Sequence, residues 1–168
     1  MLQRMIRAAR LDTDVYEEVE ADTSATIQAL TVVVLVAVAT GIGAIADRGL
    51  AGLIVGIVFG LISWAVWAYI TYLIGTTLFR TPETVASWGE LARTTGFAQS
   101  PGVLRVFGFV PVIGPVIFFA TSLWQLVAMV IAVRQALDYR STWRALGVVG
   151  VGFVVLVVIQ ALVFLVLP

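Results

Sequence analysis

Four long stretches without a charged side chain constrain this chain more than any other feature. They cover residues 23–46, 49–79, 106–133 and 145–168. About 20 apolar residues in helical form cross the hydrocarbon core of a bilayer, so each stretch is long enough to span it. Charged residues make up 12% of the chain, about half the share of an ordinary soluble domain. The sequence therefore predicts an all-α, polytopic helical bundle in a membrane.

The residue types that are missing exclude several kinds of site. The chain contains no cysteine and no histidine, which removes disulfides, thiolate or imidazole zinc sites, and imidazole general bases. The apolar stretches offer no carboxylate pair for intramembrane proteolysis, and no glycine loop leads into a lysine. We therefore expect no enzymatic activity, no cofactor and no metal. A formal net charge of zero argues against a nucleic-acid partner.

Turn-forming residues divide the stretches into helices. Asp-Arg-Gly at 47–49 predicts a tight turn, and Pro-Val-Ile-Gly-Pro at 111–115 predicts a break in a segment too long for one span. We expect a charged cytoplasmic tail over residues 1–22 and a membrane domain over 23–168. The membrane domain would hold five crossings, at about residues 25–46, 50–77, 94–110, 112–133 and 145–167.

The arginines test this topology, because positive charge concentrates in the cytoplasmic loops of membrane proteins. With five crossings and a cytoplasmic N-terminus, most arginines lie on the cytoplasmic side: Arg4, Arg7, Arg10, Arg80, Arg93, Arg134, Arg140 and Arg144. Arg48 lies outside, and Arg105 lies near the outer end of the short third span. All ten basic residues are arginine, a usage typical of GC-rich bacteria. We therefore expect a multi-pass protein of the bacterial inner membrane.

The first 22 residues allow more than one interpretation. Residues 1–11 predict either a basic amphipathic helix at the membrane interface or a frayed tail. Residues 12–22 are acidic, interrupted by Val15, Tyr16 and Val19. Here we favour a solvated connector over a short helix that docks its apolar stripe on the membrane domain or on a partner.

Two features lie in and beyond the second span. Thr81 followed by Pro82 predicts the start of an interfacial helix that includes Trp88. Trp64 lies near mid-membrane, where its indole N–H needs a hydrogen-bond partner. We interpret Trp64 as a packing residue, with the wall of a lipid or ligand pocket as the alternative.

Small residues mark a candidate packing surface. Gly52, Gly56 and Gly60 recur at every fourth position of the second span, a spacing that lets helix backbones approach closely in lipid. We favour internal packing over homodimerisation, with Ala39 and Gly43 of the first span as the facing surface.

The polar residues within the spans form a small set with a single charge. We take Ser63, Arg105, Thr121, Ser122 and Gln125 as a candidate intramembrane polar site, since polar groups at membrane depth are costly and often functional. Ser122 and Gln125 lie about one turn apart. Arg105 is close enough to the end of its span to extend its guanidinium outward.

Several short motifs follow one another in the second half of the chain. They comprise a small-Gly-aromatic-Ala-x-x-Pro segment, a proline break and two residues of the next helix: Gly96, Phe97, Ala98, Pro101, Pro111, Gly114, Trp124 and Arg134. In this order and spacing they resemble the Yip1 domain family in its bacterial form. The resemblance implies a five-span bundle with a cytoplasmic N-terminus. Eukaryotic relatives act in vesicle traffic and bind small GTPases of the Rab type, but their Asp-Leu-Tyr-Gly-Pro segment is absent here.

These observations favour a non-enzymatic scaffold or adaptor, similar to a membrane-trafficking factor. The spans would contact the lipid bilayer, while the tail and the 134–144 loop would contact a protein partner at the cytoplasmic face. One alternative is a pathway for a small solute or lipid, lined by Ser63, Thr121, Ser122 and Gln125. Another is an accessory subunit of a larger complex, with the glycine ridge as its interface. The sequence leaves the oligomeric state open.

Overall fold

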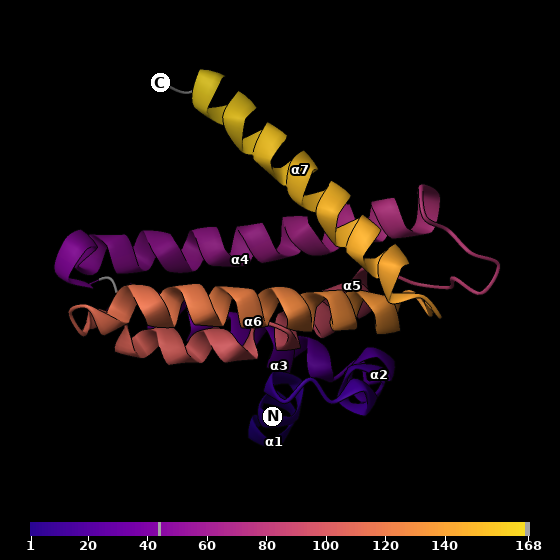
Figure 1. Cartoon of the computed structure of the whole chain (residues 1–168), viewed down its shortest axis with the longest axis horizontal. Helices are drawn as coiled ribbons and strands as arrows, with labels where there is room; N and C mark the ends of the chain where they lie inside the picture. Colours follow the sequence, from indigo (N-terminus) through magenta and orange to yellow (C-terminus); the bar gives the residue numbers. More distant parts are fainter. Residues whose placement is uncertain (44, 167–168) are drawn as a thin grey trace.

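The chain folds into helices joined by short connections (Figure 1). The computed structural model describes the backbone of residues 1–43 and 45–166, and the side chains of these residues except 45–52, 160, 163, 164 and 166. No strand occurs in the described residues, so the predicted all-α class is confirmed. The elements are α1 (Leu2–Ala9), α2 (Thr13–Ala21), α3 (Ala25–Gly43), α4 (Ile45–Thr77), α5 (Trp88–Phe97), the 3₁₀ helix η1 (Ser100–Phe109), α6 (Ile113–Ala136) and α7 (Thr142–Val166).

Among the described residues, four helices are long and apolar enough to cross a membrane. They are α3, the Leu53–Thr77 part of α4, α6, and the Thr142–Ile159 part of α7. Each is apolar on all sides, as expected for a helix that meets lipid as well as its neighbours. The chain is therefore a membrane protein with several apolar helices.

α3 lies at the centre of the packing, between α4 and η1, and η1 also packs against α6. α7 contacts α4 and α6, but mainly through its first half, where Ala145, Val148 and Val149 are buried. It then turns away from the other helices (Figure 1). Phe153 and Val154, at its middle, are already exposed.

The predicted third span, residues 94–110, is not a single α-helix. Its first residues end α5, and η1 supplies most of the remainder, beginning next to Pro101. The two parts nevertheless follow α3 in the same direction along its length. A Cβ added to Gly96 would lie 2.8 Å from Ala29 Cβ, and one added to Gly108 would lie 3.3 Å from Gly43 Cα. Since α3 rises about 1.5 Å per residue, these contacts cover about 20 Å of it.

Two predicted boundaries are wrong. The turn predicted at residues 47–49 lies within α4, because α3 already ends at Gly43 and α4 begins at Ile45. The helix predicted from Thr81 begins instead at Trp88. Ser87 and Glu90 form a capping box there, which satisfies two of the N–H groups that the first turn of a helix leaves without a partner.

The N-terminal residues form a folded cap, which we define as α1 and α2. The side chains of Val15, Tyr16 and Val19 are fully buried, and α2 contacts α5 and α6. The solvated-connector interpretation of residues 12–22 is therefore wrong, because their apolar stripe docks on the membrane domain. The frayed-tail alternative for residues 1–11 is wrong as well, since Leu2–Ala9 is helical.

Candidate functional site

Arg105 of η1 lies against three polar side chains of α6. Its Nε donates to Thr121 Oγ1 at 3.2 Å, and its Nη2 donates to Ser122 Oγ at 3.0 Å and to Gln125 Oε1. Gln125 Nε2 in turn donates to the backbone oxygen of Gln99 at 2.9 Å. The structure thus brings four of the five predicted polar residues together, and we call Arg105, Thr121, Ser122 and Gln125 the polar cluster.

The helical geometry of α6 places the three acceptors of this cluster next to one another. The hydroxyls of Thr121 and Ser122 each donate to a carbonyl one turn earlier, at 2.7 Å, so their oxygens remain available to accept from Arg105. Gln125 lies one turn after Thr121 and therefore on the same face. The guanidinium carbon of Arg105 also lies 5.7 Å from the centre of the Phe118 ring, within range of a cation–π interaction. Neutral groups therefore hold the guanidinium in place.

The polar cluster borders a cleft of about 290 Å³, at the lower end of the range for small-molecule sites. The cleft lies where α7 diverges from α4 and α6. Its lining residues are Trp67, Gln99, Arg105, Ser122, Gln125, Leu126, Met129, Val149, Phe153 and Leu156. The site therefore combines apolar walls with one cation and a few polar acceptors.

The tryptophans and Ser63 of α4 take different places relative to this cleft. Trp64 is buried, and its Nε1 donates to the backbone oxygen of Ala92 at 3.1 Å, so the expected partner of the indole exists and the residue packs internally. Trp67 lines the cleft, with its Nε1 3.1 Å from Met129 Sδ. Ser63 is not among the lining residues. Sequence reasoning thus included Ser63 and missed the role of Trp67.

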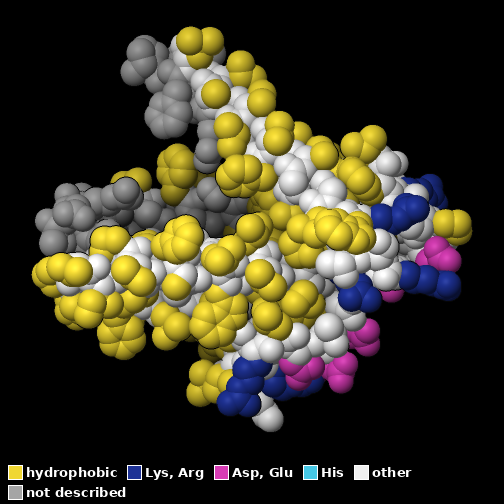
Figure 2. All heavy atoms as spheres, viewed as in Figure 1, with side chains coloured by type: hydrophobic (Ala, Val, Ile, Leu, Met, Phe, Trp, Pro, Cys, Tyr) yellow, Lys and Arg dark blue, Asp and Glu magenta, His cyan; other side chains and the backbone are white. Residues whose placement is uncertain are grey.

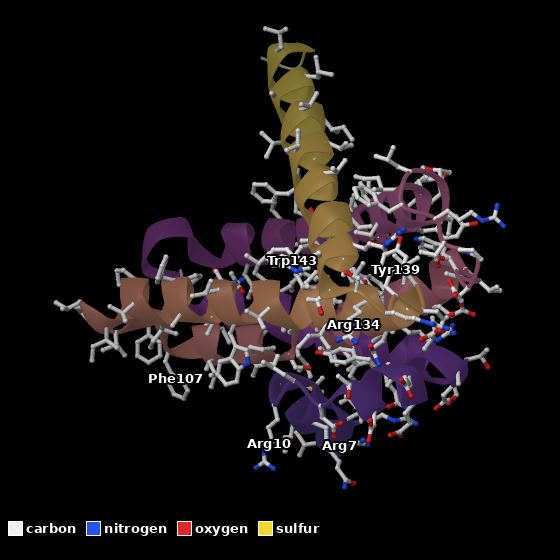
Figure 3. All side chains as sticks on the ribbon, turned by 45° about the vertical axis from the view of Figure 1, so that its right-hand side comes forward. Arg7, Arg10, Phe107, Arg134, Tyr139 and Trp143 are labelled. Carbon is white, nitrogen blue, oxygen red and sulfur yellow. The ribbon has the colours of Figure 1, made fainter. Side chains whose placement is uncertain are left out.

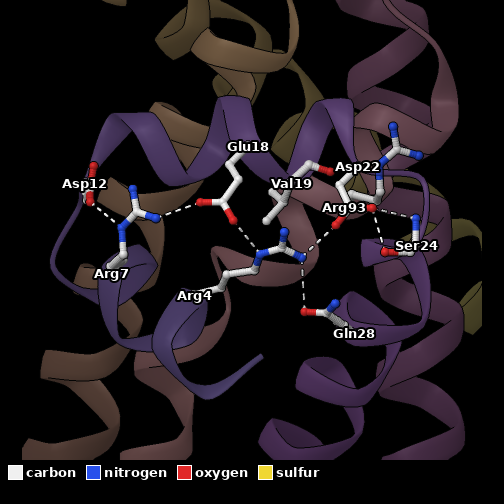
Figure 4. Close-up of polar contacts among 9 residues, drawn as sticks. All are labelled: Arg4, Arg7, Asp12, Glu18, Val19, Asp22, Ser24, Gln28 and Arg93. Carbon is white, nitrogen blue, oxygen red and sulfur yellow. Dashed lines mark hydrogen bonds and ion pairs between the residues drawn. The ribbon is translucent and has the colours of Figure 1, made fainter.

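A second polar region lies in the cap, where opposite charges pair (Figure 4). Arg4 pairs with Glu18 at 2.8 Å and with Asp22 at 2.9 Å, while Arg7 pairs with Asp12 at 2.7 Å and with Glu18 at 2.6 Å. Hydrogen bonds from Arg4 and Arg7 lower the pKa of Glu18, and the bond from Arg7 lowers the pKa of Asp12. The basic and acidic halves of the tail therefore neutralise each other across α1 and α2.

One arginine of α5 fastens the cap to the membrane domain. Arg93 is buried, and its Nε donates to the backbone oxygen of Val19 at 2.9 Å, while its Nη2 donates to that of Glu20. These carbonyls belong to the last turn of α2, where carbonyls lack helical partners and cations are favoured. Arg93 therefore acts as a C-terminal cap for α2.

Glu20 lies among other acidic groups at this junction. Burial raises its pKa to about 7, with further contributions from the nearby charges of Asp138 and Glu90, against the opposing effect of Arg93. A carboxyl group with this pKa changes its charge near neutral pH. We therefore expect the charge at the junction between cap and membrane domain to depend on pH near neutrality.

The comparison with known families decides what kind of chain carries these features. A model of the Yip1 domain matches residues 13–162. The chain belongs to the Yip1 domain family. No curated protein and no solved structure matches it. The match begins at the first residue of α2, so the Yip1 domain of this chain includes half of the cap as well as the polar cluster.

The Yip1 motif residues lie where elements meet. Residues 96–98 (Gly-Phe-Ala) are buried at the end of α5, which packs against α3 and α4. Pro101 lies in the first turn of η1. A backbone N–H there would have no acceptor within the helix, so the proline loses no hydrogen bond. Pro111 and Gly114 stand at the entry to α6, next to Val112 in the left-handed region at φ 69°. These residues shape the short segment that replaces a regular third span.

The other two Yip1 motif residues join distant elements. Trp124 Nε1 donates to the backbone oxygen of Ala9 at 2.7 Å, which ties α6 to α1. Arg134 Nε donates to the backbone oxygen of Tyr139 at 3.1 Å, and Tyr139 Oη donates to that of Gly75 at 2.9 Å. Figure 3 shows Arg134 and Tyr139 at the end of the molecule away from Phe107.

The predicted glycine ridge plays little part in the packing that the structure describes. A Cβ on Gly60 would lie 3.3 Å from Ala37 Cβ of α3, but a Cβ on Gly56 would meet nothing within 4 Å. Gly52 lies outside the residues whose surroundings are described. Gly43, expected to face this ridge, packs against Arg105 and Gly108 of η1.

A different glycine row makes the close contacts. Gly96, Gly102 and Gly108 are spaced by six residues, and a Cβ on Gly102 would lie 2.6 Å from Val36 Cγ1 of α3. A 3₁₀ helix has three residues per turn, so Gly102 and Gly108 lie on one face of η1. The spacing of six was visible in the sequence. It predicts a shared face only if the segment is recognised as a 3₁₀ helix, with three residues per turn.

The loops after α4 and α6 form a shared surface at the end of the molecule where charged side chains gather (Figure 2). We call residues 78–85 and 138–144 the loop surface. Glu83 and Arg140 approach to 3.6 Å across it, and Trp143 is 82% exposed. It contains a hollow of about 210 Å³ lined by Thr81, Pro82, Glu83, Asp138, Arg140, Ser141 and Arg144.

Proposed function

We propose that this Yip1-family protein is a non-enzymatic scaffold or adaptor of the bacterial inner membrane, which presents its loop surface to a protein partner in the cytoplasm. The observation that carries the proposal is the exposed, charge-bearing loop surface, on which Arg140, Trp143 and Arg144 are all exposed. In the first 22 residues Arg4 and Arg7 are engaged by Asp12, Glu18 and Asp22. Ion pairs within the first 22 residues therefore engage five of their nine charged side chains.

The proposal includes five crossings with the N-terminus in the cytoplasm. The arginine distribution supports it, because the first 22 residues, α5, the end of α6 and the loop surface together hold eight of the ten arginines. The course of the α5–η1 segment also favours a third crossing. It accompanies α3 from Ala29 to Gly43, about 20 Å, which is most of the hydrocarbon thickness.

A double charge reversal in the loop surface tests the adaptor role. The protein would be tagged, cross-linked in native membranes and analysed by mass spectrometry, as wild type and as Arg140→Glu with Arg144→Glu. Both arginines are exposed, so we expect normal insertion and loss of the cross-linked partner. Arg10→Glu is the matched control, because Arg10 is an exposed arginine on the cap. Equal capture by the wild type and the double variant would contradict the proposal.

Movement of a small solute or lipid is a second candidate, favoured by the position of the polar cluster on an open cleft. It predicts that Gln125→Leu changes flux in reconstituted vesicles while the amount of folded protein is unchanged. Gln125 links Arg105 to the backbone of Gln99, so its loss would rearrange the cluster. Flux equal to that of empty liposomes across a broad panel of solutes would remove this candidate.

A further inference from the structure

The guanidinium of Arg105 is held on one side only. Nε and Nη2 donate to Thr121, Ser122 and Gln125, whereas Nη1 has no acceptor among the described residues. Arg105 also belongs to the lining of the cleft. An arginine has five N–H donors in a planar fork that suits phosphate and carboxylate, and the two donors of Nη1 remain for a ligand.

The charge of Arg105 is not balanced by a described carboxylate. The acidic side chains that form ion pairs in the described structure lie in the cap and the loop surface. Hydroxyl and amide oxygens orient the guanidinium but carry no charge. A cation in an apolar setting attracts an anion strongly, because the local dielectric is low.

The apolar side of the cleft would suit a hydrocarbon chain. Leu126 and Met129 of α6 face Val149, Phe153 and Leu156 of α7 across it. The divergence of α7 (Figure 1) leaves this side of the cleft facing the space that lipid would fill. An occupant that belongs here therefore has an anionic acceptor at one end and a hydrocarbon body that continues into the bilayer.

The guanidinium of Arg105 lies deeper along the bundle than the end of η1. Arg105 precedes Phe109, the last residue of η1, by four positions, which is about 8 Å in a 3₁₀ helix. Ser122, which accepts from the guanidinium, lies nine positions after Ile113, the first residue of α6, or about 14 Å along that helix. An anionic headgroup on Arg105 would therefore lie inside the cleft, below the ends of these helices.

We propose that the cleft binds one anionic glycerophospholipid of the phosphatidylglycerol class, with its phosphate on Arg105 and one acyl chain between α6 and α7. The glycerol hydroxyls of such a headgroup would meet Ser122 and Gln125, which both donate and accept. A phosphatidylethanolamine headgroup carries an ammonium group, for which the described lining provides no carboxylate. This inference is independent of the proposed adaptor function.

Native mass spectrometry on the full-length protein tests the inference. The protein would be placed in nanodiscs that contain equal amounts of phosphatidylglycerol and phosphatidylethanolamine with the same acyl chains. We expect one retained phosphatidylglycerol per wild-type chain. Loss of a charge-assisted interaction lowers affinity about tenfold to a hundredfold, so Arg105→Gln should lose the retained lipid.

Two further variants separate binding from folding. Leu156→Trp keeps the arginine but fills the apolar part of the cleft, and it should also displace the lipid. Arg10→Gln removes an exposed arginine of the cap and should retain it. Equal retention of phosphatidylglycerol by wild type, Arg105→Gln and Leu156→Trp would overturn the site. Equal retention of the two lipids by the wild type, or retention of neither, would overturn the assignment of its ligand.

Discussion

The α3–η1–α6 side of the molecule packs far more closely than the α7 side. Gly43, Gly102 and Gly108 leave no room for a Cβ between these elements, whereas Gly150 of α7 would meet nothing within 4 Å. Hydrogen bonds from Arg105 and Gln125 also join η1 to α6. In lipid, where apolar contact alone gives little drive for association, glycine and polar contacts decide which helices approach. The close side therefore fixes the arginine, and the open side gives access to it.

The cap packs on the closely packed α3–η1–α6 side of the molecule. Loss of its buried side chains should have the largest effect on stability. Tyr16 is fully buried, and its hydroxyl donates to the backbone oxygen of Ala8 at 3.1 Å. We expect Tyr16→Ala to cost about 3–5 kcal/mol, as large-to-small substitutions of buried aromatics do. Hydrogen exchange should then show loss of protection in α1 and α2, with α3 and α6 still protected.

Tyr16→Phe is the control, because it keeps the ring and removes one hydrogen bond, worth about 1 kcal/mol. If Tyr16→Ala left the protection of α1 and α2 unchanged, the cap would owe its position to the hydrogen bonds from Arg93 and Trp124 rather than to its buried stripe.

Overfilling the close side should have the next largest effect. A leucine at residue 102 would collide with Val36 of α3 and with the side chain of Gln125. We expect Gly102→Leu to cost about 2–3 kcal/mol, as overpacking of a filled interior does. Unfolding in mild detergent, followed by circular dichroism, would measure it. A wild-type midpoint would mean that η1 does not lie against α3.

The pH dependence of the cap gives a smaller effect. Burial raises the pKa of Glu20 from its ordinary value of 4.5 to about 7, so the folded state holds this proton more tightly. The resulting stability is complete below pH 4.5 and is lost as pH rises through 7. After allowance for partial exposure, we expect the docked cap to weaken by about 1 kcal/mol between pH 5 and pH 8.

Glu20→Gln should remove this slope, measured by hydrogen exchange of α2 at both pH values. The groups that face Glu20 are Glu17 of α2, Glu90 and Arg93 of α5, and Asp138 after α6. The carboxylates of Asp12, Glu18 and Asp22 have lowered pKa values and titrate below this range. A slope that persists in Glu20→Gln would assign the effect to another group.

The long apolar helices could be predicted because a run of about twenty uncharged, apolar residues is long enough to span a bilayer, where a helix satisfies every backbone hydrogen bond. The family could also be recognised, from short motifs around Gly96 and Pro111. The polar cluster was predictable as a set, because few polar residues occur within the spans. Its geometry was not, since it depends on η1 being a 3₁₀ helix that turns Arg105 toward α6.

The cap was misread for a different reason. Its nine-residue helix α2 has only three large apolar side chains, so the sequence pattern alone is too weak to separate a docked helix from a connector. The decisive contacts come from Arg93, more than seventy residues away. A lone arginine near the start of a predicted span gave no indication that it caps another helix.

The two glycine rows give the last contrast and the smallest expected effect. Since a Cβ on Gly56 meets nothing within 4 Å, Gly56→Leu should change the free energy of unfolding by less than about 0.5 kcal/mol, as surface substitutions do. The same detergent unfolding used for Gly102→Leu would measure it. A loss as large as that of Gly102→Leu would show that the α4 ridge packs internally after all. An unchanged midpoint together with loss of a cross-linked protein would instead identify Gly56 as part of an interface with another chain.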